Sequence, residues 1–297
     1  MGSVLGQAVC RDAFSGPGLG KVYSIIGSSL GAFPAIGPFI GGIIAQYYDW
    51  STIFLFLIVC ALALMACIMF LLPETLHRTT EAKPTLFAVA SRLIRDKRVF
   101  GFGLIVAASN GITFSYFAEG SFFLIKMLGM SPSQYGLSFI GIAISTVAGG
   151  MLSHRLHNTH SGLQIMWYGV LTMLFSTTTF SLLTICHLYC YTFSTHTMIA
   201  ITICSQMVTM LGRCLAVSNA LALSLVRYRE AIGSASSLFI CFYYCVISLC
   251  TLGMGALHNG TLLPMPLFFM GLAVCAAAVR FLLLPEKQRR EEPILEQ

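Results

Sequence analysis

Long apolar segments separated by short polar ones dominate the chain. A membrane-spanning helix needs about 20 mostly apolar residues, and eight segments reach roughly that length, after a half-length apolar piece at Met1–Phe14. The pattern predicts an all-α membrane protein with about eight full transmembrane helices plus a half helix. The predicted spans are Val22–Tyr47, Ser51–Leu72, Val99–Ile125, Ser133–Ser153, Leu163–Cys186, Met198–Val226, Ala231–Leu257 and Leu262–Leu284.

The longest polar stretch, residues 77–98, separates two of these spans from the other six. It predicts a linker with one amphipathic turn (Leu86, Phe87, Val89, Leu93) that lies at the membrane surface. Transporters are often built from paired halves, so six spans after a linker predict six before it. We therefore expect about three and a half helices to be missing ahead of Met1. The expected parts are the rest of an N-terminal bundle (1–76), the linker (77–98), a C-terminal six-helix bundle (99–285) and a tail (286–297).

Lysine and arginine residues are concentrated at alternate connections. Loops that face the cytoplasm carry an excess of these residues. The opposite connections contain almost none, with Lys126 as the exception. The distribution predicts a cytoplasmic C-terminus, and cytoplasmic loops at 11–21, 77–98, 154–162 and 227–230.

Composition agrees with the span pattern and excludes several classes of function. The chain is 57% hydrophobic and 9% charged, with a mean hydropathy of +0.82, whereas a soluble domain carries about 25% charged residues. Its net charge of +6 comes from residues at span ends, so it does not indicate nucleic-acid binding. The eleven cysteines form no CxxC pair. Phosphate-loop, nucleophile-elbow and zinc motifs are absent from the sequence, which predicts neither an enzyme nor a cofactor.

A dense cluster of glycine and proline lies within the first full span. Prolines bend membrane helices, and small residues at four-residue spacing let two helix backbones approach closely. We expect this helix to seal one side of the protein in one conformation and open it in another; packing alone is the alternative. The cluster consists of Gly27, Gly31, Pro34, Gly37, Pro38, Gly41 and Gly42.

Several segments, in the order in which the chain presents them, resemble motifs of the major facilitator superfamily, and in particular of its Bcr/CflA-type (bicyclomycin and chloramphenicol resistance) drug:proton antiporters. Residues 33–42 resemble the antiporter motif of the fifth helix, and residues 49–54 the entry into the sixth. Further similar segments are 8–14, 72–76, 130–137, 218–223 and 231–238. The resemblance implies a major-facilitator-type helical bundle, normally of twelve helices, that is here N-terminally truncated.

Some positions depart from the family pattern. Phe33 replaces the usual glycine of the motif, and Ser51 replaces the usual arginine after Trp50. The first three helices and the arginine-bearing start of the fourth have no counterpart in the chain. In the family, acids of the first helix commonly take part in proton coupling, so those acids would be missing too.

Two charged residues inside predicted spans are candidates for proton or substrate binding. Glu119 is the only acid well within a span, and Arg213 lies midway along another. Ionisable residues are expensive in the membrane and tend to serve function. Glu119 could instead be a solvated or paired residue near the outer interface, close to Lys126. Arg213 could instead extend toward the cytoplasmic face.

Polar and aromatic residues suggest a cavity for apolar drugs. Such cavities combine aromatic walls with a few polar groups. The polar candidates are Asn110, Tyr116, Gln206 and Asn219, although any one could simply be a core residue. His154, His157 and His160 lie three apart, but their short loop contains neither acid nor cysteine, so we expect no metal site.

Together these features predict a multi-pass transporter of the bacterial inner membrane for multidrug efflux and drug resistance. We expect it to export small amphipathic drugs or other xenobiotics in exchange for protons, as a monomer in the lipid bilayer. The alternatives are a metabolite or amino-acid exporter on the same scaffold, or a non-transporting truncated remnant. The 297-residue form is itself expected not to transport.

Overall fold

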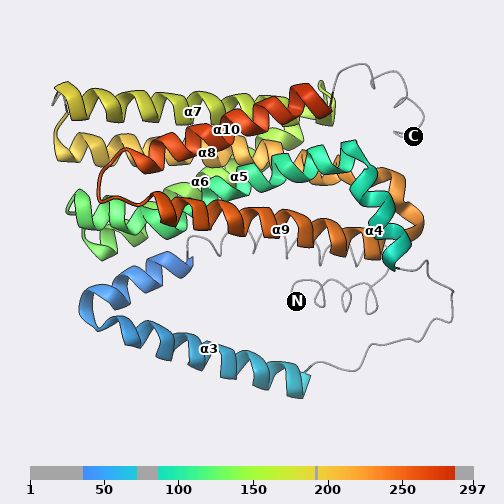
Figure 1. Cartoon of the computed structure of the whole chain (residues 1–297). Helices are drawn as coiled ribbons and strands as arrows, with labels where there is room; N and C mark the ends of the chain where they lie inside the picture. The colour runs from blue at the N-terminus through green and yellow to red at the C-terminus, as the bar shows by residue number, and fades with distance from the viewer. Residues whose placement is uncertain (1–35, 72–85, 191–192, 285–297) are drawn as a thin grey trace. The chain divides into compact units, whose positions relative to one another are not determined.

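The computed structural model describes residues 36–71, 86–190 and 193–284, and all regular structure in these ranges is helical. Ile36–Tyr47 forms the first described helix. The longer helices, labelled in Figure 1, are α3 (Trp50–Leu71), α4 (Leu86–Arg95), α5 (Lys97–Ser121), α6 (Pro132–Leu156), α7 (Gly162–Cys190), α8 (Thr195–Ser224), α9 (Ile232–Leu257) and α10 (Pro264–Leu283). Two short elements complete the described part, the π-helix η1 (Phe122–Met127) and the 3-10 helix η2 (Val226–Ala231).

Seven of the described helices are long and apolar enough to cross a membrane. They coincide with the last seven spans predicted from the sequence, and their ends differ from the predictions by only a few residues. The all-helical membrane fold is thereby confirmed. Of the remaining predicted span, Val22–Tyr47, only the end from Ile36 onward is described, and the half helix Met1–Phe14 lies outside the described residues.

The chain divides into two compact units. The first comprises Met1–Ala82 together with Ser131–Ala143, and the second comprises Lys83–Met130 together with Ile144–Gln297. Helix α6 therefore contributes its first half to one unit and its second half to the other. The boundary between the units at Ala82 falls inside the linker predicted at 77–98. The sequence did not indicate that α6 would be divided between the two units.

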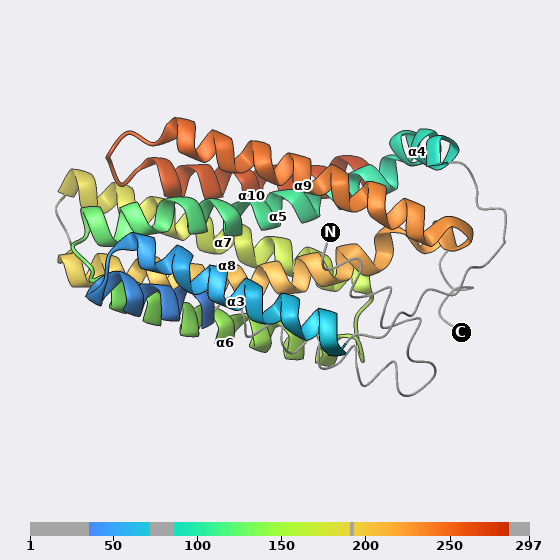
Figure 2. The ribbon, with the colours of Figure 1, turned by 90° about the horizontal axis from the view of Figure 1, so that it is seen from below.

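Helix α5 is the centre of the second unit. It packs against α8, α9 and α10, and its side chains are buried along most of its length. Figure 2 shows α9 and α10 running alongside α5. Helices α7 and α8 pair closely, because a Cβ added at Gly169 would lie 2.5 Å from the carbonyl oxygen of Gly212. Small residues at such crossings let helix backbones touch where lipid supplies no hydrophobic force between helices.

Helix α4 corresponds to the amphipathic turn predicted in the linker, and it is longer than one turn. Its apolar face is buried against the rest of the second unit, with Val89 and Leu93 only 5% and 7% exposed. Asp96 caps the N-terminus of α5. Its side chain accepts hydrogen bonds from the backbone amides of Arg98 (3.0 Å) and Val99 (3.4 Å). Such a cap satisfies the free amides at a helix start. Asp96 alone separates α4 from α5.

Candidate functional site

Polar side chains from α5 and α8 meet midway along both helices. Asn110 lies 13 positions after Lys97, or about 20 Å along α5 at 1.5 Å per residue. The guanidinium Nη1 of Arg213 donates a hydrogen bond to the side-chain oxygen of Asn110 at 3.0 Å. The sequence singled out both residues separately, and the structure brings them together.

The charge of Arg213 has no opposing carboxylate among the described residues. Asn110 is its one recorded hydrogen-bond acceptor there, and its Nε atom is buried without a partner. The side chain is nevertheless partly exposed. A guanidinium in this position retains donors that can bind an oxygen atom of a ligand.

The register of the two antiparallel helices extends this polar group. One turn from Asn110, the hydroxyl of Thr113 contacts the sulfur of Met210 at 3.5 Å. Another turn in the same register brings Gln206 of α8 to the level of Tyr116 on α5. Both residues are buried, and the side-chain oxygen of Gln206 has no hydrogen-bond partner among the described residues.

Asn219 belongs to a different contact. Its side-chain nitrogen donates to the hydroxyl of Ser153 on α6 at 3.0 Å and to the carbonyl of Leu215 at 2.8 Å. Both bonds are buried, so this asparagine ties α8 to the second half of α6. The structure does not bring it into the group formed by Asn110 and Arg213.

Glu119 pairs with a histidine that the sequence reasoning did not select. Nδ1 of His258, just beyond α9, lies 2.6 Å from Oε1 of Glu119. The glutamate side chain is 8% exposed and that of His258 is 37% exposed. Lys126, which the sequence placed beside Glu119, instead lies over the ring of Phe122 at 5.6 Å. The available signal was that His258 directly follows a span ending on the same side as Glu119.

The glycine and proline cluster is described only from Gly37 onward; Gly27, Gly31 and Pro34 lie outside the described residues. Within the first unit, a Cβ added at Gly42 would lie 2.5 Å from the carbonyl oxygen of Pro132 on α6. Gly136 of α6 is equally close to the carbonyl oxygen of Pro38. This helix therefore makes a backbone-to-backbone contact with the start of α6.

Among the described residues, the close approach falls on Gly42 rather than on Gly37 or Gly41. The four-residue spacing suggested that Gly37 and Gly41 make the close approach, but no described atom lies within 4 Å of a Cβ built at either. Pro38, Phe39 and Gly42 make it instead. Pro38 and Gly42 lie four positions apart, and Phe39 and Gly42 lie three apart, spacings that place each pair on one face of a helix.

His154, in the last turn of α6, and the loop residues His157 and His160 are not grouped as metal ligands would be. Nδ1 of His160 lies 2.7 Å from the hydroxyl of Thr159. Among the residues that the structure describes, no three His, Cys, Asp or Glu side chains are grouped as metal ligands would be.

Comparison with known proteins places the chain in a family. The family model described as Major Facilitator Superfamily matches residues 1–251. The chain belongs to the major facilitator superfamily. The match covers most of the chain, and it agrees with the seven apolar helices of the structure.

Proteins similar to this chain are named as a transporter or as resistance proteins. An uncharacterized transporter of Rickettsia bellii is 31% identical over 293 residues, which is 96% of this chain and 71% of that protein. A bicyclomycin resistance protein homolog of Haemophilus influenzae is 30% identical over 156 residues, 51% of this chain and 39% of the relative. A chloramphenicol resistance protein of Pseudomonas aeruginosa is 28% identical over 141 residues, 47% and 33% of the two chains.

Proposed function

We propose that this protein exports small amphipathic molecules, including drugs, in exchange for protons. The observation that carries the proposal is the backbone contact of Gly42 and Gly136. It lies in the segment that resembles the antiporter motif, and a contact this close can form and break as a unit. The names of the resistance proteins similar to this chain support the choice of drugs as substrates.

In this proposal, the polar group of α5 and α8 holds the substrate. Asn110, Arg213 and Gln206 would supply a few polar atoms on helices whose other buried residues, such as Ile112 and Tyr116, are mostly apolar or aromatic. Such a combination orients an amphipathic molecule while most of its binding free energy comes from apolar contact. Tyr116 would provide an aromatic surface at the same level.

Glu119 and His258 would exchange the coupled proton. The carboxylate is buried but its partner is partly exposed, so a proton can reach the pair from the aqueous side through His258. Protonation of Glu119 removes the charge that attracts a protonated His258, which weakens the link between α5 and the segment after α9. A change at this pair can thereby bias the packing of the helices that carry the substrate group.

The orientation and location that we propose follow from the charge distribution. The ends with Arg92, Arg95 and Arg155 would face the cytoplasm, together with the C-terminus, in a bacterial inner membrane. Glu119 and His258 would then lie near the outer surface, where protons enter in exchange for exported substrate.

The test is expression of the complete form of the protein in a drug-sensitive bacterial strain. We expect tolerance to several amphipathic drugs to rise severalfold over an empty-vector strain. In inside-out vesicles with an acidified lumen, drug addition should release protons. Unchanged tolerance together with no proton release from protein-containing vesicles would refute the proposed export.

A further inference from the structure

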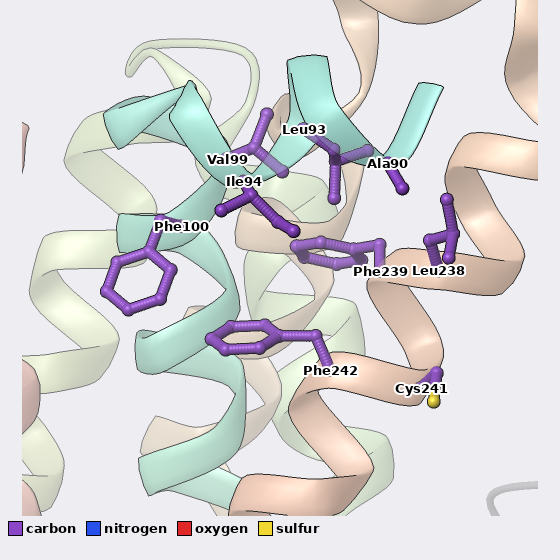
Figure 3. A pocket seen from close by; sticks show the side chains of 9 residues that line it. All are labelled: Ala90, Leu93, Ile94, Val99, Phe100, Leu238, Phe239, Cys241 and Phe242. Atoms are coloured by element: carbon purple, nitrogen blue, oxygen red, sulfur yellow. The ribbon is translucent and has the colours of Figure 1, made fainter. Parts of the chain in front are cut away.

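An apolar crevice lies where α4, the start of α5 and α9 meet. Its volume is about 390 Å³. Figure 3 shows side chains from all three helices turned toward it, and every side-chain atom drawn is carbon except the sulfur of Cys241. Its walls include Leu93, Ile94, Phe100, Leu238, Phe239 and Phe242.

The crevice is open rather than filled by the protein. The rings of Phe100 and Phe242 lie 5.1 Å apart along one side, while Ile94 on α4 remains 77% exposed. The walls offer no nitrogen or oxygen side-chain atom to a polar ligand. Whatever enters must therefore place a hydrocarbon part inside.

Positively charged residues are neighbours in sequence of residues that line the crevice: Arg95 follows Ile94, and Lys97 lies two positions before Val99. Arg95 ends α4 and Lys97 begins α5, and both are exposed with no recorded ion pair or hydrogen bond among the described residues. The nearby carboxylate, Asp96, is already engaged: it caps α5 and accepts a hydrogen bond from the hydroxyl of Tyr228 at 3.2 Å. Arg92 lies 5.1 Å from the centre of the Tyr228 ring.

The chemistry of the occupant follows from these two features. Helices α5 and α9 are long and apolar enough to span a membrane, so a crevice near their ends would lie where acyl chains meet headgroups. Each Lys or Arg near a membrane surface contributes about 1 kcal/mol toward binding an anionic lipid. A molecule with a hydrocarbon chain and an anionic phosphate is the one that satisfies both the crevice and the two cations.

We propose that the crevice and the Arg95–Lys97 pair bind an anionic phospholipid. One acyl chain fills the space between α4 and α9, and the phosphate group contacts the two cations. Since α4 packs on the bundle through Val89 and Leu93, a bound lipid would also hold α4 in place. This site lies outside the residues that we propose for substrate and proton.

Native mass spectrometry of the purified chain tests the proposal. The protein in detergent is mixed with equal amounts of phosphatidylglycerol and phosphatidylcholine, and the bound lipids are counted. We expect phosphatidylglycerol to be retained preferentially. The double variant Arg95→Gln/Lys97→Gln should weaken that binding by about tenfold or more, since two charges are removed.

Two further variants test the apolar part. Ala90→Phe and Cys241→Phe each fill the crevice, from α4 and from α9, and each should reduce retention of phosphatidylglycerol. Two positions are used because, if one variant fails to fold, the other still tests the crevice. Arg155→Gln, an exposed cation at the end of α6, is the matched control and should bind lipid as the unmodified chain does.

Several outcomes would overturn the proposal. One is equal binding of the two lipids with no effect of the double charge variant. Displacement of the lipid by millimolar glycerol phosphate would instead indicate a site for a soluble phosphate. Displacement by an uncharged amphipathic drug, regardless of the charge variant, would indicate an entry site for substrate.

Discussion

Arg213 carries a permanent charge that the described residues do not neutralise. Asn110, which is neutral, accepts a hydrogen bond from Nη1 of Arg213. The Nε atom of Arg213 remains buried without an acceptor among the described residues. Holding a charge without a counter-ion among apolar helices costs free energy, so its replacement by an apolar side chain of similar size should not lower stability. A residue kept at some expense to stability is a strong candidate for function.

Replacement of this arginine should separate function from stability. We expect Arg213→Met to lower drug transport by about tenfold, the effect of losing about 1.4 kcal/mol of binding. The melting temperature of the purified variant should equal or exceed that of the unmodified protein. Arg213→Lys should retain part of the activity, since it keeps the charge but loses the planar fork. A strong loss of thermal stability in Arg213→Met would instead assign the residue a structural role.

The pair of Glu119 and His258 allows a second prediction. In Glu119→Gln the side chain can no longer take up a proton, but it keeps its size and can still accept a hydrogen bond from His258. We expect drug-induced proton release from vesicles to disappear, while exchange of labelled for unlabelled drug continues. Lys126→Gln is the matched control and should leave proton release unchanged, because Lys126 lies over Phe122. Normal proton release in Glu119→Gln would contradict this role.

At the scale of elements, two backbones approach more closely than side chains would permit. The helix Ile36–Tyr47 meets the start of α6 at Gly42 and Gly136, where an added methyl group would overlap a carbonyl oxygen. Backbone atoms cannot move aside as a flexible side chain can. A substitution there must separate the two helices, and this cost is typically 1–3 kcal/mol.

The glycine contact predicts a non-additive pair of substitutions. Gly42→Ala and Gly136→Ala should each lower the free energy of unfolding in detergent by about 1–3 kcal/mol. The double variant should lose less than the sum, because the first substitution already separates the helices. Gly41→Ala is the control, since no described atom lies within 4 Å of its added Cβ. Additive losses, or an equal loss in the control, would contradict the contact.

At the scale of the whole molecule, the basic and non-basic connections alternate along the chain. The connection between α7 and α8 belongs to the non-basic set and carries Cys190 at the end of α7, which is exposed. The opposite connection after α6 carries Arg155. Because an orientation rule applies to all connections together, one residue on each side suffices to test it.

Labelling of intact cells checks this orientation. In a background with the other cysteines replaced, a membrane-impermeant maleimide should label Cys190 from outside. With Cys190 also replaced, Arg155→Cys should be labelled only after the membrane is opened. Labelling of Arg155→Cys in intact cells would invert the orientation and move the proposed proton entry at Glu119 to the other side.

The local pattern of apolar residues determined much of the fold. Each described span was predicted because its length and hydropathy are properties of a continuous segment. The amphipathic residues of the linker likewise indicated α4, although not that Val89 and Leu93 pack on the bundle. The family was recognisable because its motifs are short runs of neighbouring residues, such as 33–42.

The partners of the candidate residues were decided by tertiary structure alone. Residues far apart in sequence meet in the contacts of Glu119 with His258, of Arg213 with Asn110 and of Gly42 with α6. In a membrane helix the faces toward lipid and toward protein are both apolar, so periodicity marks neither the packing face nor the neighbour. Sequence alone thus determined the spans and the rare polar residues within them, whereas helix packing decided which of those residues act together.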